Sequence, residues 1–233
     1  MPGTALIAGV GPGFCESLAW KCAREGHPIG LFARSEAYLS ELEREFRDEG
    51  FKADAVAVDL TDPEAVGEAF GAVRDRLGPI EVLAHTASTV TGGSQEELDP
   101  DRLEQLWRLY CYSGLCCFRA VREDLLTTEG TTLFFGASVN AGDFAFKSGK
   151  DAMRGLARAL AGEYGPKGIH IAHVIIDGGL LNPDVYEAET TVDEEAYIDP
   201  EAAAETCYRL IEQPATARTF ELDLHAQDRS VSY

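Results

Sequence analysis

FKSGKDAMRGLARALAGEYGPKGI, residues 146–169, is the stretch of this chain that decides its fold. A helical pattern covers 145–164, and the apolar run IHIAHVII follows it at 169–176. Phe146 and Lys150 stand four residues apart, so their side chains lie on one face of the predicted helix. A long helix that leads directly into an apolar strand is typical of a parallel sheet covered by helices.

The same alternation of short apolar runs and amphipathic stretches continues along the whole chain. It predicts one α/β domain over residues 1–233: a Rossmann-type, doubly wound parallel sheet of about seven strands with helices on both faces. The predicted strands are 4–9, 28–33, 53–58, 80–85, 131–136, 169–176 and 219–224. The predicted helices are 14–25, 35–49, 62–77, 99–124, 145–164 and 200–212.

Residues 178–199 break this rhythm. The segment is polar and acidic and follows the sixth predicted strand. A loop beyond the carboxyl end of such a strand lies over the ligand crevice of the sheet. We interpret it as a substrate lid, with a plain surface insertion as the alternative.

The chain is strongly acidic, with 40 Asp and Glu residues against 20 Lys and Arg residues and a formal charge of −20. Such a surface repels phosphates, which excludes nucleic acids and anionic membranes as expected partners. The first residues run directly into an apolar strand, and no apolar run has the length of a bilayer span. We therefore expect a cytoplasmic protein with a small-molecule substrate.

The charge also predicts a response to salt. Self-repulsion destabilises a compact acidic protein unless counter-ions screen it, which favours a high-salt cytoplasm over a merely acidic mesophilic protein. We expect the melting temperature to rise as KCl approaches molar concentration. A melting temperature that stays flat over that range would rule out the halophilic interpretation.

Six cysteines occur without a C-x-x-C pair or a histidine at zinc-ligand spacing. Most lie inside apolar runs, which favours small buried side chains in a reducing compartment over disulfides or a metal site. We predict no metal centre.

A glycine-rich loop, Gly9-Val10-Gly11-Pro12-Gly13-Phe14, joins the first predicted strand to the first predicted helix. Glycines at this place let the backbone turn tightly and approach a pyrophosphate, which then lies on the helix amino end. We expect Gly9, Gly11, Gly13 and Phe14 to contact a dinucleotide.

The ends of the next two strands indicate which dinucleotide, NAD(H) or NADP(H), the cleft would bind. The second strand ends at Arg34, with no carboxylate there to hold the ribose 2′-hydroxyl of NAD, and an arginine suits the 2′-phosphate of NADP. We therefore favour NADP(H) over NAD(H), with a solvated surface arginine as the alternative. Asp59 and Leu60 follow the third strand, near the expected adenine, whereas Asp62 before Pro63 suits a helix cap better.

Taken with Ser138 and the helix over 146–164, these residues make the chain resemble the short-chain dehydrogenase/reductase family over nearly its whole length. The resemblance is most specific over 150–169 and is also good at Gly9–Gly13 and at AVDL, residues 57–60. It implies an NADP(H)-dependent oxidoreductase that acts on a carbonyl or an alcohol. It also implies dinucleotide contacts from Ala87, Lys150 and Gly178, and a homodimer or homotetramer formed through the helices at 99–124 and 145–164. The apolar residues of these helices belong either to that contact or to the core; they include Leu109, Leu115, Phe118, Met153, Leu156 and Leu160.

The family's catalytic residues are Asn, Ser, Tyr and Lys. Carried over by position, Ser138 matches the serine and Lys150 the lysine, but Phe146 stands at the tyrosine position and Cys111 at the asparagine position. Further departures are HTAS at 85–88 after the fourth strand, Cys15 in the place of a third loop glycine, and Asp177 before Gly178.

Phenylalanine has no proton to donate, and the loss of a general acid typically lowers a rate by ~10²–10⁴. Three substitutes are open: a water held between Ser138 and Lys150, His85 at the end of the fourth strand, or Tyr186 in the expected lid. Asp143 suits a helix cap better than an acid role. A dinucleotide-binding sensor or inactive partner subunit, and a non-redox isomerase or lyase, remain alternative functions.

Overall fold

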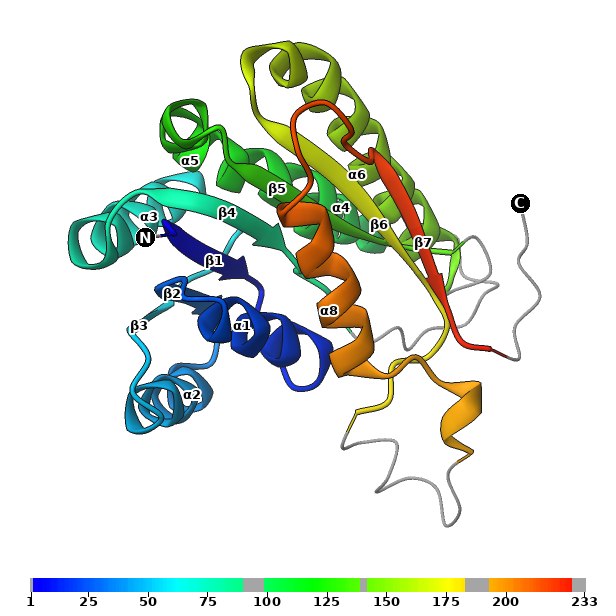
Figure 1. Ribbon diagram of the computed structural model, residues 1–233. Helices are drawn as coiled ribbons and strands as arrows, with labels where there is room; N and C mark the ends of the chain where they lie inside the picture. Colours follow the sequence, from blue (N-terminus) through cyan, green and yellow to red (C-terminus); the bar gives the residue numbers. More distant parts are fainter. Residues whose placement is uncertain (1, 90–98, 139–141, 183–192, 228–233) are drawn as a thin grey trace.

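The computed structural model describes residues 2–89, 99–138, 142–182 and 193–227. Within them, parallel strands form one sheet in the order β3-β2-β1-β4-β5-β6-β7 (Figure 1). The predicted doubly wound fold is confirmed, with strand ends within two residues of the expected ones. The strands are β1 (Thr4–Ala8), β2 (Ile29–Ala33), β3 (Ala53–Ala57), β4 (Ile80–His85), β5 (Thr131–Ala137), β6 (His170–Asp177) and β7 (Glu221–His225).

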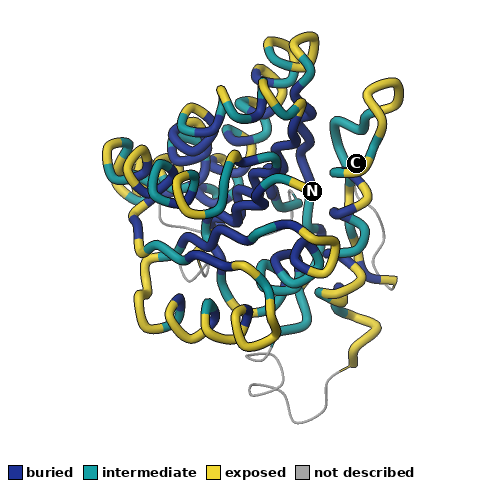
Figure 2. Tube along the Cα trace, turned by 60° about the vertical axis from the view of Figure 1, so that its left-hand side comes forward, coloured by how far each residue is buried: buried dark blue, intermediate teal, exposed yellow. Residues whose placement is uncertain are grey.

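Helices cover both faces of the sheet, and each face has its own apolar core. One face packs against α1 (Phe14–Arg24), α2 (Glu36–Asp48) and α8 (Pro200–Ile211). The other packs against α3 (Pro63–Leu77), α4 (Pro100–Trp107), α5 (Ser113–Thr128) and α6 (Phe144–Tyr164). Figure 2 shows the sheet buried between helices whose outer sides are exposed. Burial on both faces explains why the strands read as continuous apolar runs rather than as alternating ones.

Side chains cap most of the helix starts. Asp62 accepts hydrogen bonds from the N–H groups of Glu64 and Ala65, and Asp143 accepts one of 2.8 Å from Phe146. Both acids are thus helix caps, as predicted. Helix α1, by contrast, follows Gly13 without a side-chain cap from any described residue.

The helix expected over 99–124 is interrupted. Between α4 and α5 lies the π-helical turn η1 (Arg108–Tyr112), and α5 extends to Thr128. A π turn holds one more residue than an α turn, so it rotates the side chains that follow it. Residues 108–112 contain no proline or glycine, so the sequence did not predict this turn.

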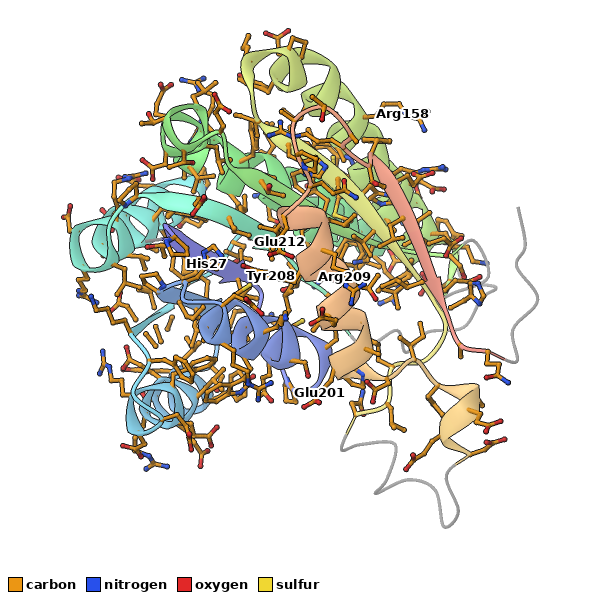
Figure 3. All side chains as sticks on the ribbon, viewed as in Figure 1. His27, Arg158, Glu201, Tyr208, Arg209 and Glu212 are labelled. Atoms are coloured by element: carbon orange, nitrogen blue, oxygen red, sulfur yellow. The ribbon has the colours of Figure 1, made fainter. Side chains whose placement is uncertain are left out.

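Helix α8 is attached to the β1–β2 half of the sheet through His27 (Figure 3). His27 Nδ1 lies 2.7 Å from the carbonyl oxygen of Gly3, and Nε2 lies 3.1 Å from the hydroxyl of Tyr208. Nδ1 therefore carries the proton and Nε2 accepts from Tyr208.

Four cysteines, Cys22, Cys116, Cys117 and Cys207, are buried, and Cys15 and Cys111 are half-buried. All six are free thiols, as expected. Among the described helices, none combines the length and apolar character needed to cross a bilayer.

The chain leaves β1 toward β2 and β3, then crosses back so that β4 pairs with β1. A parallel sheet whose strand order reverses in this way has a crevice at the carboxyl ends of the two strands. The functional site is therefore expected beyond Ala8 and His85.

Candidate functional site

A cleft of about 720 Å³ lies at this switch point. Its lining comes from the ends of β1 to β4 and from one side of the α4–η1 segment. The residues that line it are Gly9, Val10, Gly11, Pro12, Ala33, Arg34, Ser35, Tyr38, Val58, Asp59, Leu60, Thr61, Ala87, Ser88, Thr89, Arg102, Gln105, Leu106 and Leu109. Six of the predicted dinucleotide contacts are thus in one cleft: Gly9, Gly11, Arg34, Asp59, Leu60 and Ala87.

The glycine-rich loop forms the floor at the β1 end. Gly9 has a φ of +103°, and a Cβ there would lie 2.6 Å from the Ala87 backbone, so only glycine fits. Gly11 faces open space. Because α1 has no side-chain cap, its first N–H donors remain available to an anion. Gly13 precedes α1, whereas the Phe14 side chain packs in the core against Phe135, with ring centroids 5.1 Å apart.

Arg34, Ser35 and Tyr38 line the cleft where β2 gives way to α2. Arg34 is exposed, and the Tyr38 hydroxyl donates a 2.6 Å hydrogen bond to Glu16 Oε1. Asp59 lies across the cleft, where its carboxylate accepts bonds of 2.9 and 2.8 Å from the N–H and the hydroxyl of Thr61. These bonds, the backbone one first, hold the pKa of Asp59 below its usual value.

Lys150 is turned into the protein rather than toward solvent. Its ammonium donates a 2.9 Å hydrogen bond to the carbonyl oxygen of Phe135 in β5. It lies 4.3 Å from the ring centroid of Tyr110 and 5.8 Å from that of Phe146. Burial lowers the pKa of Lys150 to about 8, although the two aromatic faces offset part of the cost of a buried cation.

His85 is fully buried, with Nε2 2.8 Å from the hydroxyl of Ser113, the first residue of α5. Ser113 donates its own proton to the carbonyl oxygen of Leu109, so it accepts from His85 Nε2. Burial, followed by the charge of Lys150, lowers the pKa of His85 to about 3. The imidazole is therefore neutral at physiological pH and enclosed in the core, which suits packing rather than proton transfer.

Ser138 and Cys111 lie in different parts of the fold, just after β5 and in η1. Ser138 directly follows β5, and its N–H donates to the carbonyl oxygen of Ile176 at 3.3 Å. The Cys111 thiol donates a 3.5 Å hydrogen bond to the carbonyl oxygen of Ala152, which attaches η1 to α6. Neither side chain lines the cleft.

The described ends of the segment 178–199 pair with each other, and its start lies beside the glycine-rich loop. Leu180 pairs with Ile198 in a parallel bridge, and a Cβ on Gly13 would lie 3.2 Å from Cβ of Asn182. A short 3-10 turn, η3 (Glu194–Ala196), follows. Tyr186 lies outside the described residues. The described start of the segment therefore lies beside the glycine-rich loop, and its role as a lid stays a prediction.

Residues 3–190 match the family model described as short chain dehydrogenase. The chain belongs to the short-chain dehydrogenase family. It is 27% identical over 183 residues to the 3-ketodihydrosphingosine reductase of Mus musculus, covering 73% of this chain and 55% of that protein. The chain thus spans about half the length of that relative.

Solved structures of this family have the same fold. A short-chain dehydrogenase from Rhodopseudomonas palustris superposes with a TM-score of 0.80 at 26% identity, over 96% of this chain and 98% of that one. An alcohol dehydrogenase from Thermococcus sibiricus, complexed with 5-hydroxy-NADP, superposes with a TM-score of 0.85 at 22% identity over the full length of both. The fold of the short-chain dehydrogenase family binds a nicotinamide dinucleotide.

Sequence reasoning missed three side chains of this site. Arg102 lines the cleft and joins α4 to α6, because its Nε donates a 2.8 Å hydrogen bond to Asp143 Oδ2. The N–H of Phe146, followed by Arg102, keeps the pKa of Asp143 low. Tyr38 shares the Arg34 end of the cleft, and Tyr110 lies against Lys150. Arg102 lies on the helix before η1 and Tyr110 lies within η1, a turn whose π-helical form no local pattern indicated.

Proposed function

We propose that this protein is an NADP(H)-dependent oxidoreductase that interconverts a carbonyl and an alcohol, with Phe146 at the position of the family's tyrosine. The supporting observation is the cleft itself. At one end of the cleft, Gly9 and Gly11 lie beside the amino terminus of α1, which has no side-chain cap. At the other end of the cleft, Arg34 is exposed. An anionic diphosphate and a second phosphate fit these two places.

The residues fit a dinucleotide along the whole cleft. Gly9, Gly11 and the first N–H groups of α1 would hold the diphosphate, and the small residue Ala87, packed against Gly9, would line the cleft beside it. Asp59 and Leu60 would bound the adenine. Arg34 would contact a 2′-phosphate. The bound cofactor would supply a hydride to the substrate.

The chain's own residues define the other half of the chemistry. Ser138 would orient the substrate oxygen, and Lys150 would place a positive charge behind it. Phe146 is apolar and nine-tenths buried, so it excludes water but donates no proton. Cys111 supplies a thiol in the place of an amide. The proton must therefore come from another group.

Phe146 also supports a second function. A dinucleotide-binding sensor or an inactive partner subunit would keep the cleft and lose the acid, and a non-redox isomerase or lyase would need a different acid. The retained Lys150 favours the enzyme, because burying a cation is costly and a purely structural site has no need of one.

A titration with NADPH and NADH in high-salt buffer, followed by nicotinamide fluorescence and then by turnover of a ketone panel, tests the proposal. Micromolar binding of NADPH with ketone reduction supports the oxidoreductase. Tight binding without turnover supports the sensor or the non-redox enzyme. If neither NADPH nor NADH binds, the oxidoreductase and the dinucleotide-binding alternatives are all contradicted.

The preference for NADP(H) is tested by Arg34→Ala. A charge-assisted hydrogen bond contributes about 1.5–3 kcal/mol, so we expect the Kd for NADPH to rise about 10–100-fold. The Kd for NADH should stay within about twofold. Arg44→Ala is the matched control, since Arg44 lies on α2, the helix that begins just after Arg34, and is exposed and paired only weakly with Glu41 at 3.7 Å. Equal losses for both dinucleotides would contradict a 2′-phosphate contact.

We also propose that the protein forms a homo-oligomer in a cytoplasmic setting. Of the apolar residues on the two long helical segments, Phe118, Met153 and Leu160 are buried in the core. Leu115 is 43% exposed and Trp107 is equally exposed. These two side chains support a contact through the outer side of α4 and α5.

A further inference from the structure

The hydroxyl of Tyr110 is a buried polar group close to this site that lacks a well-formed hydrogen bond to any described residue. Tyr110 is fully buried in η1, and its hydroxyl makes no hydrogen bond of good geometry with any described residue. Buried polar groups are nearly always paired, and an unpaired one costs free energy. Such a hydroxyl indicates a partner that arrives with a ligand.

The Tyr110 ring is held in one position by α6. A Cβ on Gly149 would lie 2.8 Å from Tyr110 Cδ2, so only glycine leaves room for the ring. The Phe146 ring meets it edge-on, at 5.6 Å and 80°. The Lys150 ammonium lies 4.3 Å from its centroid. The structure thus has a phenol packed against Lys150, on η1 rather than on α6.

The phenol points toward the cleft. Burial raises the pKa of Tyr110, and the Ser88 side chain and the Thr89 backbone, which lie close enough to act on its hydroxyl, offset part of that rise; both residues line the cleft. Leu106 and Leu109, four residues and one residue before Tyr110, line it as well. The hydroxyl therefore lies directly beneath the cleft floor beyond β4.

The π turn sets this direction. η1 spans Arg108–Tyr112 and centres on Tyr110, and the extra residue turns the phenol inward between the sheet and α6. π turns inside longer helices often occur at functional sites, because they cost stability and need a compensating role. Here the compensating role is the placement of one side chain.

We propose that Tyr110 is the proton donor of the reaction, in place of the tyrosine that residue 146 lacks. This inference rests on the proposed oxidoreductase function. In reduction, the carbonyl carbon would gain a hydride, with its electron pair, from bound NADPH, which becomes NADP+, and the electron pair of the C=O π bond would move onto oxygen. That oxygen takes the proton of the Tyr110 hydroxyl, and solvent returns a proton to the phenolate.

The surroundings suit this role. Burial raises the pKa of Tyr110, so the phenol is protonated at neutral pH and ready to donate. The Lys150 ammonium over the ring stabilises the phenolate that donation leaves behind.

The test compares the wild type with Tyr110→Phe, with Tyr112→Phe as a control from the same turn, and with the double variant Tyr110→Phe/Phe146→Tyr. We expect Tyr110→Phe to lower kcat for ketone reduction by ~10²–10⁴ while the Kd for NADPH stays within about twofold. Its melting temperature should equal or exceed that of the wild type, since an unpaired buried hydroxyl is removed. Tyr112→Phe should keep the wild-type kcat.

The double variant separates catalysis from packing. It places a phenol at residue 146, the position of the family's tyrosine, beside Lys150. We therefore expect its kcat to be at least tenfold higher than that of Tyr110→Phe. Unchanged kcat in Tyr110→Phe, or a lower melting temperature without a change in kcat, would overturn the proposal and leave the oxidoreductase intact. A wild type that binds NADPH but reduces no ketone would instead refute the proposed function, and this inference with it.

Discussion

Gly9→Ala is expected to abolish dinucleotide binding and to lower the free energy of unfolding by about 2–5 kcal/mol. The new Cβ would lie 2.6 Å from both Cα and N of Ala87, and the backbone φ of +103° already excludes side chains. Neither atom belongs to a flexible side chain, so β1 and β4 would have to separate at the cleft. Chemical denaturation and NADPH fluorescence titration measure the two effects.

Gly11→Ala is the matched control within the same loop. No described residue lies within 4 Å of the Cβ position at Gly11, and its φ is not in the left-handed region. We expect the free energy of unfolding to stay within about 0.5 kcal/mol of the wild type, while the affinity for NADPH falls because the methyl group occupies the path of the diphosphate. A Gly11→Ala protein with wild-type affinity would place the diphosphate elsewhere, and a stable, binding-competent Gly9→Ala protein would contradict the assembly of the cleft.

Lys150→Met is expected to stabilise the fold by about 1–3 kcal/mol at pH 7 and to remove reductase activity. Burial lowers the pKa of Lys150 from 10.5 to about 8, which corresponds to about 3 kcal/mol against the charged form. The hydrogen bond to Phe135 and the Tyr110 ring offset part of this cost and set the lower end of the range. Methionine keeps the length of the side chain without its charge.

The pH dependence distinguishes this cause from a packing effect. The unfolded chain binds the lysine proton more tightly than the native protein does, so the wild type gains stability as pH rises from about 8 to 10.5. Below pH 8 the cost of the buried charge is fully present, and the difference between wild type and Lys150→Met should be greatest. It should disappear above pH 10.5. The control Lys147→Met, which changes a half-buried lysine on the same helix, should show no such difference, and a pH-independent gain for Lys150→Met would exclude the buried charge as its cause.

The caps and the glycine-rich loop were predictable because their causes are local. Asp62 and Asp143 are short acidic side chains directly before helical patterns, and capping depends only on the next three residues. Gly9 and Gly11 follow an apolar run that could only be a buried strand. The resemblance to the short-chain dehydrogenase family could be recognised for the same reason, because the motif that carries it most specifically is a continuous stretch at 150–169.

The surroundings of the reacting groups were not predictable in this way. His85 looked like a strand-end residue near the cofactor, but Ser113, 28 positions later, holds it in the core. Tyr110 carried no signal at all, because its place depends on a π turn and on the space above Gly149. Both outcomes depend on how η1 and α6 pack across the sheet.

The sequence by itself determined the doubly wound sheet, the order of its elements and the loop that forms the cleft floor, because apolar periodicity, glycines and caps act over a few residues. Only the tertiary structure decided that Lys150 points inward to β5 and that a phenol from η1 lies beside it. Those contacts join residues 15 and 40 positions apart, and their geometry follows from the packing of helices against the sheet rather than from any local preference.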